Sequence, residues 1–178
     1  MFFYELETER LLLKNISYED RDFILKQFSN DSVNRYLFDA EPLHSLEEAD
    51  EIIYYYVQPE PRIQHRWILT LKSSGVKIGT CGFHCWDKSK NCVDVGYDLQ
   101  EEYWGQGLMS EAFNRVLEFA KTEMKVMQVR AHIYVDNAKS IGLVKKFGFG
   151  FHGETEVCAF HEKEYLHHIY TLECVPTK

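Results

Sequence analysis

Short runs of alternating apolar and polar residues predict β-strands along much of the chain, because successive side chains of a strand point to opposite faces. An early candidate is Arg10–Lys14, which contains three consecutive leucines. Further on, polar turns separate three such runs, and this pattern predicts an antiparallel meander. The predicted strands are Trp67–Lys72, Lys77–Phe83 and Cys92–Leu99, joined by turns at Ser73–Gly75 and Asp87–Asn91.

Two pairs of polar residues mark the starts of helices in the first third of the chain. Ser17 with Asp20, and Ser45 with Glu48, have the spacing of a capping box. In that motif each of the two side chains accepts a hydrogen bond from the main-chain N–H of the other residue. The sequence therefore predicts that a helix follows Ser17 and that another follows Ser45.

The second half of the chain alternates between helical and extended patterns. Apolar residues recur every three or four positions from the glycines at 105 and 107 to about Thr122, which predicts an amphipathic helix. The following segments predict a strand, a short helix that ends before a glycine, and a final pair of strands. Their expected bounds are Val126–Val135, Ala138–Phe147, Phe151–Phe160 and Tyr165–Glu173.

This succession of elements indicates the α+β class, because a strand–helix–strand unit lies among mostly antiparallel strands. The sequence has no repeat, no low-complexity stretch and no linker rich in proline or glycine. It therefore predicts one domain that spans residues 1–178. Gly96 lies inside a predicted strand, where a glycine indicates a bulge or the close approach of another backbone.

The charge and the cysteines narrow the expected partners and location. The formal net charge of −8 disfavours a nucleic-acid partner, because affinity for phosphates comes from clustered lysine and arginine. No signal-peptide pattern opens the chain, and no apolar run approaches the roughly 20 residues that span a bilayer. Five cysteines predict reduced thiols in a cytoplasm. The spacing of Cys81, Cys85 and Cys92 is not that of a zinc site, so no metal is expected.

Gly105 and Gly107 are the strongest local signal for chemistry, because they lie between a predicted strand and an amphipathic helix. Such a turn can aim several main-chain N–H groups at one point, where the helix dipole also favours negative charge. Glycine lets a phosphate oxygen approach closely. The pair alone is equally compatible with an ordinary helix start. The Gly-Lys-Ser/Thr of a P-loop and the third glycine of a dinucleotide fold are both missing.

The residues around these glycines resemble the coenzyme A signature of the GNAT acetyltransferases. The strand Val93–Leu99, followed by Tyr103–Gly107 and Ser110–Ala112, has the order and spacing of that signature. The rest of the chain is similar to the branch that includes ribosomal-protein alanine and serine N-acetyltransferases. The matching pieces are Thr8–Leu13, Lys77–Thr80, Asn137-x-x-Ser140 and Lys146–Phe149, so the resemblance runs from about Glu7 to Leu172.

This resemblance implies a fold and a cofactor site. The sheet is expected to be mostly antiparallel, with helices on both faces, and to open in a V between Cys92–Leu99 and Val126–Val135. Main-chain N–H groups before the long helix would hold the pyrophosphate of acetyl-CoA, and the end of the preceding strand would pair with its pantetheine arm. The implied cofactor-binding residues are Asp98, Leu99, Trp104, Gly105, Gln106, Gly107, Leu108, Met109 and Asn137.

Asn137 and Glu102 each leave a question open. Asn137 is also a normal N-cap residue for the helix that it precedes. Glu102 occupies a place where GNAT proteins usually have Gln or Arg. A carboxylate near a pyrophosphate is unfavourable unless it points to solvent, so we expect reduced or rearranged contacts to the cofactor with binding retained.

Ser140 and Asp94 are the candidate catalytic residues. Ser140 matches the position that would protonate the departing thiolate, with a helix serine without chemistry as the alternative. Asp94 is the first candidate for the base that accepts the proton of the amine, and a salt-bridged strand aspartate is the alternative. Glu154 and Glu156 are the next candidates for the base. The remaining groups with suitable pKa values, interpreted as ordinary strand histidines, are His84, His167 and His168.

The implied reaction is transfer of an acetyl group from acetyl-CoA to a primary amine by direct attack in a ternary complex. At pH 7, deprotonating a lysine-like amine costs roughly 4–5 kcal/mol, whereas an α-amine costs only about 1.4 kcal/mol. Because no strong base is evident, the α-amine of a protein or peptide N-terminus is the favoured acceptor. Small amines such as polyamines, amino acids or an antibiotic come next. A non-catalytic acyl-CoA-binding module is the alternative from another class, and a homodimer is included because this branch often forms dimers.

Overall fold

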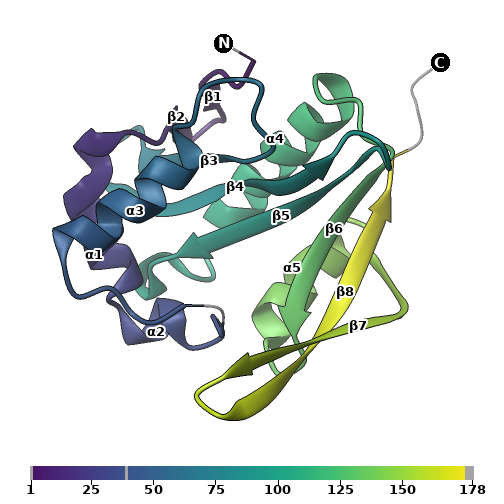
Figure 1. The fold of residues 1–178 in the computed structure, drawn as a ribbon. Coiled ribbons are helices and arrows are strands. Elements are labelled where there is room, and N and C mark those ends of the chain that lie inside the picture. The colour runs from purple at the N-terminus through teal and green to yellow at the C-terminus, as the bar shows by residue number, and fades with distance from the viewer. Residues whose placement is uncertain (1, 39, 175–178) are drawn as a thin grey trace.

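The computed structural model describes residues 2–38 and 40–174, and its centre is an eight-stranded sheet (Figure 1). The strands are ordered β1-β2-β3-β4-β5-β6-β8-β7. Every neighbouring pair runs antiparallel except β5 and β6. The strands are β1 (Leu6–Glu7), β2 (Leu11–Asn15), β3 (His65–Leu71), β4 (Lys77–Asp87), β5 (Cys92–Leu99), β6 (Gln128–Tyr134), β7 (Gly150–Phe160) and β8 (Lys163–Glu173).

The helices lie on both faces of this sheet. They are α1 (Arg21–Phe28), α2 (Asp31–Asn34), α3 (Leu46–Tyr56), α4 (Leu108–Thr122) and α5 (Ala138–Lys146), with short 3-10 turns at Tyr18–Asp20 and Glu101–Tyr103. Ile24 of α1 and Ile53 of α3 pack against Ile68 on one face. The apolar stripe of α4 packs on the opposite face, as its sequence predicts.

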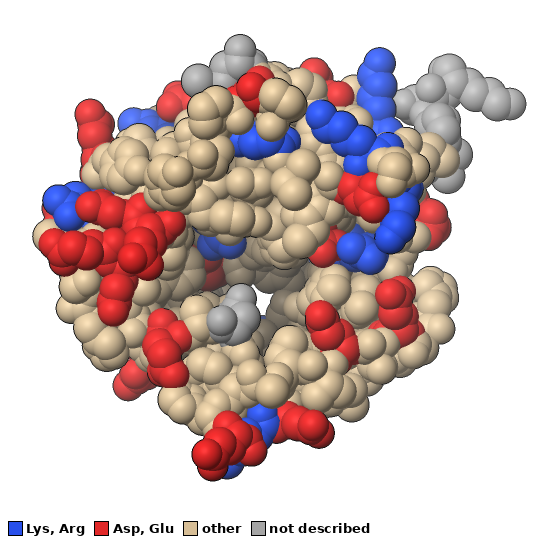
Figure 2. Space-filling view, viewed as in Figure 1, with Lys and Arg blue, Asp and Glu red and all other residues tan. Residues whose placement is uncertain are grey.

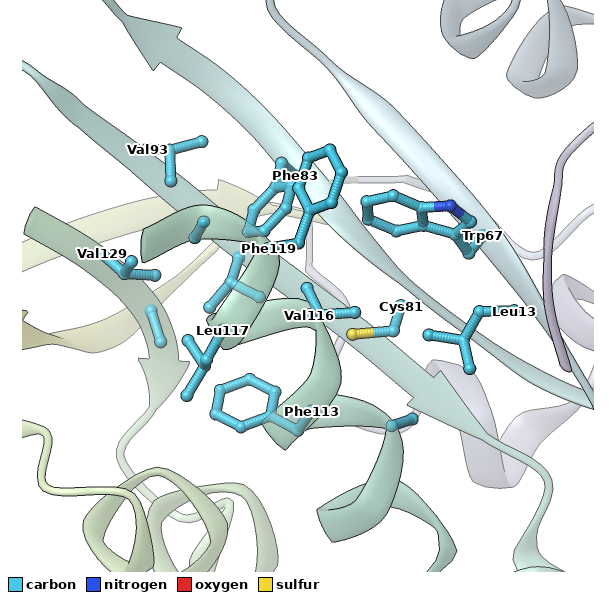
Figure 3. Close-up of a cluster of buried hydrophobic side chains, with 14 of the residues drawn as sticks. Leu13, Trp67, Cys81, Phe83, Val93, Phe113, Val116, Leu117, Phe119 and Val129 are labelled. Carbon is cyan, nitrogen blue, oxygen red and sulfur yellow. The ribbon is translucent and has the colours of Figure 1, made fainter. Parts of the chain in front are cut away.

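The larger core lies between α4 and the sheet. Figure 3 shows α4 directing Phe113, Val116, Leu117 and Phe119 toward side chains of the strands, among them Trp67 and Phe83. All of these residues are buried. Burial of each large apolar side chain stabilises the fold by roughly 1.5–3 kcal/mol. This packing fixes α4, and therefore its N-terminus, relative to the ends of the strands.

The sheet opens between β5 and β6. The two strands pair only over Cys92–Asp94 and Gln128–Arg130 and then diverge (Figure 1). Parallel neighbours need a long crossover connection, and α4 provides it. The open edge of β5 beyond Asp94 faces the gap. The predicted α+β fold, with a mostly antiparallel sheet splayed into a V, is therefore confirmed.

The predicted elements agree with the structure in type, and one local prediction is wrong. Both capping boxes form, although the first opens a 3-10 turn that leads into α1. The sequence did not predict the short elements β1 and α2. Gly96 is not in a bulge, because it pairs in regular register with Gly82. The irregularity lies in β4, where Cys85 and Trp86 stand opposite the single residue Val93 and Cys85 has a φ of 53°.

A glycine at position 96 has a different structural explanation. A Cβ at this position would lie 3.0 Å from Cε1 of His84, so the glycine makes room for that ring. Elsewhere, the last two strands meet in a tight turn at His161 and Glu162, both with positive φ. None of the helices in residues 2–38 and 40–174 is long and apolar enough to cross a membrane.

Candidate active site

A cleft of about 950 Å³ lies where the two arms of the sheet separate. Its walls come from the end of β5, the turn before α4, the first turns of α4 and α5, and the segment around α2. Figure 2 shows that the surface is hollowed at this place. All of the predicted cofactor-binding residues except Gln106 line the cleft, and so does Ser140. Asp94 is not among the lining residues.

The turn before α4 has the geometry of an anion-binding site. Gly105 and Gly107 have φ angles of 73° and 77°, a region that residues with a side chain adopt at a cost. Gly107 is the N-cap, and no side chain caps the helix, so the first N–H groups of α4 are not satisfied by a cap. A Cβ built on Gly105 would meet no atom within 4 Å, which leaves open space beside the turn.

Aromatic and basic side chains extend this site. The indole N–H of Trp104 donates to the main-chain oxygen of Leu99 at 2.8 Å, and this bond ties the turn to the end of β5. Lys139 from α5 lies over the Trp104 ring at 3.7 Å. Lys139 and Lys146 both line the cleft and carry charge that suits phosphates. Glu102 is exposed, so its carboxylate is open to water.

These residues fit acetyl-CoA. Unsatisfied N–H groups at a helix N-terminus, two lysines and room beside a glycine are what a pyrophosphate requires. The main chain of β5 is free of β6 at Asp98 and Leu99, so an extended pantetheine arm has an edge to pair with. Among the described residues, no group of three or more His, Cys, Asp and Glu side chains is placed to hold a metal ion.

Ser140 lies next to a residue that the sequence did not single out. Its Oγ is 2.5 Å from the phenolic oxygen of Tyr97 on β5. Burial raises the pKa of Tyr97 above its ordinary value, so the phenol stays protonated at neutral pH. Asn137 caps α5 by accepting a hydrogen bond from the Ser140 N–H at 3.2 Å, as its alternative interpretation has it. The structure thus brings two hydroxyl groups together at the cleft.

The side chain of Asp98 belongs to a buried polar network at the end of β5. Its carboxylate is 3.1 Å from Nη1 of Arg66 and 2.6 Å from Nε2 of Gln27. It also accepts hydrogen bonds from the hydroxyl and the N–H of Thr80. Burial raises the pKa of Asp98 against the lowering effect of Arg66. The network joins α1, β3, β4 and β5 beside the cleft.

The surroundings of Asp94 argue against its predicted role as the base. Its carboxylate is 2.8 Å from Nε of Arg130 and 3.5 Å from Nε2 of His132. Burial acts to raise the pKa of Asp94, but hydrogen bonds from His132 and Arg130 outweigh it and lower the pKa. A paired carboxylate with a lowered pKa is a weak proton acceptor. Glu156, another candidate, is 2.6 Å from Nδ1 of the same His132.

Sequence reasoning missed Tyr97, although a signal was present. By strand alternation Tyr97 shares a face with Val95 and Leu99, which identifies the side toward α4. Its partner Ser140 lies on α5, after the crossover and β6. Only the divergence of the two strands brings these elements together, and the sequence pattern does not give its angle.

Comparisons with known proteins agree with this geometry. Residues 10–150 match the family described as "Acetyltransferase (GNAT) domain". The chain is 31% identical over 145 residues to the uncharacterized N-acetyltransferase YoaA of Bacillus subtilis (strain 168), with 81% of each chain covered. It is 29% identical over 145 residues to the uncharacterized N-acetyltransferase p20 of Bacillus licheniformis, again with 81% of each covered.

A solved structure shares the fold. The spermidine N-acetyltransferase of Vibrio cholerae, in complex with CoA and spermine, superposes with a TM-score of 0.82. The match covers 94% of this chain and 97% of that chain at 19% identity, so the likeness concerns the fold. With its family match, its V-shaped sheet and its cleft at the α4 N-terminus, the chain belongs to the GNAT family and is an acetyl-CoA-dependent N-acetyltransferase.

Proposed function

We propose that this N-acetyltransferase acetylates the α-amine of a peptide or protein N-terminus. The observation that carries the proposal is the pairing of the carboxylates on β5. Asp98 is paired with Arg66, and Asp94 is paired with Arg130. A polycation such as a polyamine gains most from carboxylates that are not already neutralised. Paired carboxylates therefore favour an acceptor that carries a single amine.

The pKa of the acceptor supports the same choice. An α-amine with a pKa near 8 reaches its neutral, nucleophilic form at pH 7 at a cost of about 1.4 kcal/mol. A lysine-like amine costs roughly 4–5 kcal/mol and needs a strong base in contact with it. The carboxylate expected to serve as that base is engaged by Arg130 and His132. An α-amine can react without it.

The roles of the chain's own residues follow from this placement. Acetyl-CoA supplies the thioester whose acetyl group is transferred. The N–H groups from Trp104 to Met109 would hold its pyrophosphate, and the main chain at Asp98 and Leu99 would pair with its pantetheine arm. The hydroxyls of Tyr97 and Ser140 lie 2.5 Å apart and would donate a hydrogen bond to the departing sulfur.

Acceptor-dependent release of thiol from acetyl-CoA tests the proposal. Peptides that begin with Ser or Ala would be compared with the same peptides blocked at the N-terminus, each with one internal lysine. Release with the free peptides and none with the blocked ones is expected, with the added mass on the first residue. Faster release with spermidine, amino acids or aminoglycosides would overturn the choice of acceptor. The homodimer, the cytoplasmic location and the single domain of residues 1–178 stay predictions.

A further inference from the structure

Arg10 and Glu111 form a compact ion pair beside the glycine turn. Nε of Arg10 lies 2.6 Å from Oε2 of Glu111, and the main-chain N–H of Arg10 donates to Oε1 of Glu111 at 2.7 Å. The hydroxyl of Thr8 also donates to Oε1. Glu111 is in the first turn of α4, and Arg10 directly precedes β2. The pair therefore fastens the start of the first long strand to the start of α4.

The same guanidinium reaches into the turn itself. Nη1 of Arg10 donates to the main-chain oxygen of Gln106 at 3.0 Å. A peptide unit is planar and trans, so its C=O and N–H point in opposite directions. With the Gln106 oxygen held by Arg10, the N–H of Gly107 points away from Arg10. Gly107 lines the cleft and Arg10 does not, so this orientation turns the N–H to the cleft side.

The glycine turn needs an interaction that fixes its conformation. Gly105 and Gly107 give the segment more conformational freedom than any other residues would, and ordering them costs free energy when a ligand binds. An arrangement that is already fixed before binding removes this cost from the affinity.

The charge of Glu111 is secured by its partners. Partial burial acts to raise its pKa, but hydrogen bonds from the Thr8 hydroxyl, the Arg10 N–H and the Arg10 guanidinium lower the pKa below its ordinary value. Glu111 is therefore ionised at neutral pH and holds Arg10 in place through two oxygens. The guanidinium donates to Glu111 through Nε alone, and a hydrogen bond between two charged groups is stronger than one between neutral groups.

We propose that Arg10 and Glu111 are positioning residues that pre-organise the Gly105–Gly107 turn for the pyrophosphate of acetyl-CoA. The inference rests on the proposed placement of the cofactor at this turn. Its consequence is selective, because only donors that carry a pyrophosphate benefit from the ordered N–H groups. S-acetylpantetheine has the same thioester and arm without the pyrophosphate. A purely structural tie between β2 and α4 would affect both donors alike.

The experiment compares the two donors in Arg10→Gln and in the wild-type protein. KM for acetyl-CoA should rise on the order of tenfold with kcat within about twofold, because the lost hold acts before the chemical step. KM for S-acetylpantetheine should stay unchanged. Glu111→Gln should shift KM for acetyl-CoA in the same direction by less, since Gln106 keeps its bond to Arg10. Arg115→Gln is the matched control, because Arg115 forms an exposed pair with Glu118 on the same helix.

Each outcome decides the matter. Unchanged KM for acetyl-CoA in Arg10→Gln, or an equal rise for both donors in a protein that still melts cooperatively, would overturn the inference. Gly105→Glu and Gly105→Ala test the placement on which it rests, because both strain the backbone at a position where a Cβ meets no atom within 4 Å, and only the first adds a charge. If the two bind acetyl-CoA equally well in calorimetry, the placement itself is wrong. If only Gly105→Glu loses binding while Arg10→Gln keeps it, the placement stands and the positioning role of Arg10 and Glu111 is wrong.

Discussion

Replacing Asp98 by alanine tests the buried ion pair behind the open edge of β5. The side chain of Asp98 is 7% exposed, and the side chain of its partner Arg66 is 13% exposed. Removing the carboxylate leaves Arg66 as an unpaired charge and takes the acceptor from Gln27 Nε2, which now lies 2.6 Å from it. The Thr80 hydroxyl loses its acceptor as well.

The expected loss of stability follows from the burial of the Asp98–Arg66 pair. Removing one partner of a buried pair costs about 3–5 kcal/mol, because the remaining charge stays desolvated. For a domain of this size, each kcal/mol lowers the melting temperature by roughly 2–4 °C. Asp98→Ala should therefore lower the melting temperature by roughly 6–20 °C. Binding of acetyl-CoA should weaken too, since the main chain of Asp98 belongs to the edge that we propose for the pantetheine arm.

Thermal unfolding followed by circular dichroism measures the effect. The exposed pair of Lys90 and Asp87, 3.7 Å apart, is the matched control, and Lys90→Ala should change stability by less than about 1 kcal/mol. The double change Asp98→Leu with Arg66→Met should recover much of the loss, because apolar residues can replace a buried pair. A decrease below 2 °C in Asp98→Ala, or a double variant less stable than the single one, would refute the reasoning.

Two further outcomes are expected. Ser140→Ala and Tyr97→Phe should each lower kcat with little change in the Kd for acetyl-CoA, because we propose that the two hydroxyls act on the departing sulfur. Stopped-flow measurement of thiol release checks this, and an unaltered rate would remove both residues from the mechanism. The Asp94 carboxylate, 3.5 Å from Nε2 of His132, raises the pKa of His132 despite its burial, and Glu156 adds to the effect. The stability from His132 is therefore fully present below pH 6.5 and lost as pH rises through the higher folded-state pKa. His132→Gln should flatten this decline in urea unfolding, and an unchanged slope would contradict it.

Much of the fold is local information and could be predicted from the sequence. The stripe from Met109 to Ala120 has a helical period, and one face of it is buried in the structure. The capping boxes at Ser17 and Ser45 predict the helical segments that follow them, and both boxes form in the structure. The two glycines of the turn are also a local signal, because Gly105 and Gly107 adopt the positive φ angles that favour glycine. In each case the physical cause lies within a few residues of the signal.

The parts that could not be predicted depend on contacts between distant segments. Gly96 predicted a bulge or the close approach of another backbone, but a glycine in a strand is equally explained by a bulky side chain, here His84 across the ladder. Asp94 was a reasonable base until the fold placed Arg130 and His132 beside it from another strand. The pairing of Tyr97 with Ser140 requires the angle of the V. The alternation of residues along a strand predicts which face of the sheet a side chain lies on, but it does not predict which residue of another segment the side chain contacts.

The acidic character of the chain and its use of an anionic cofactor are compatible because electrostatics at the site are local. The net charge of −8 describes the whole surface, whereas interactions between exposed charges fade over roughly 10 Å at moderate salt. Within the cleft, Arg35, Lys139, Lys146 and the N-terminus of α4 contribute positive potential against the carboxylates of Asp98 and Asp136. The carboxylates nearest to it on β5 are neutralised by arginines. Net charge therefore argues against a long polyanion that must contact much of the surface, and it carries no weight against a pyrophosphate held in one turn.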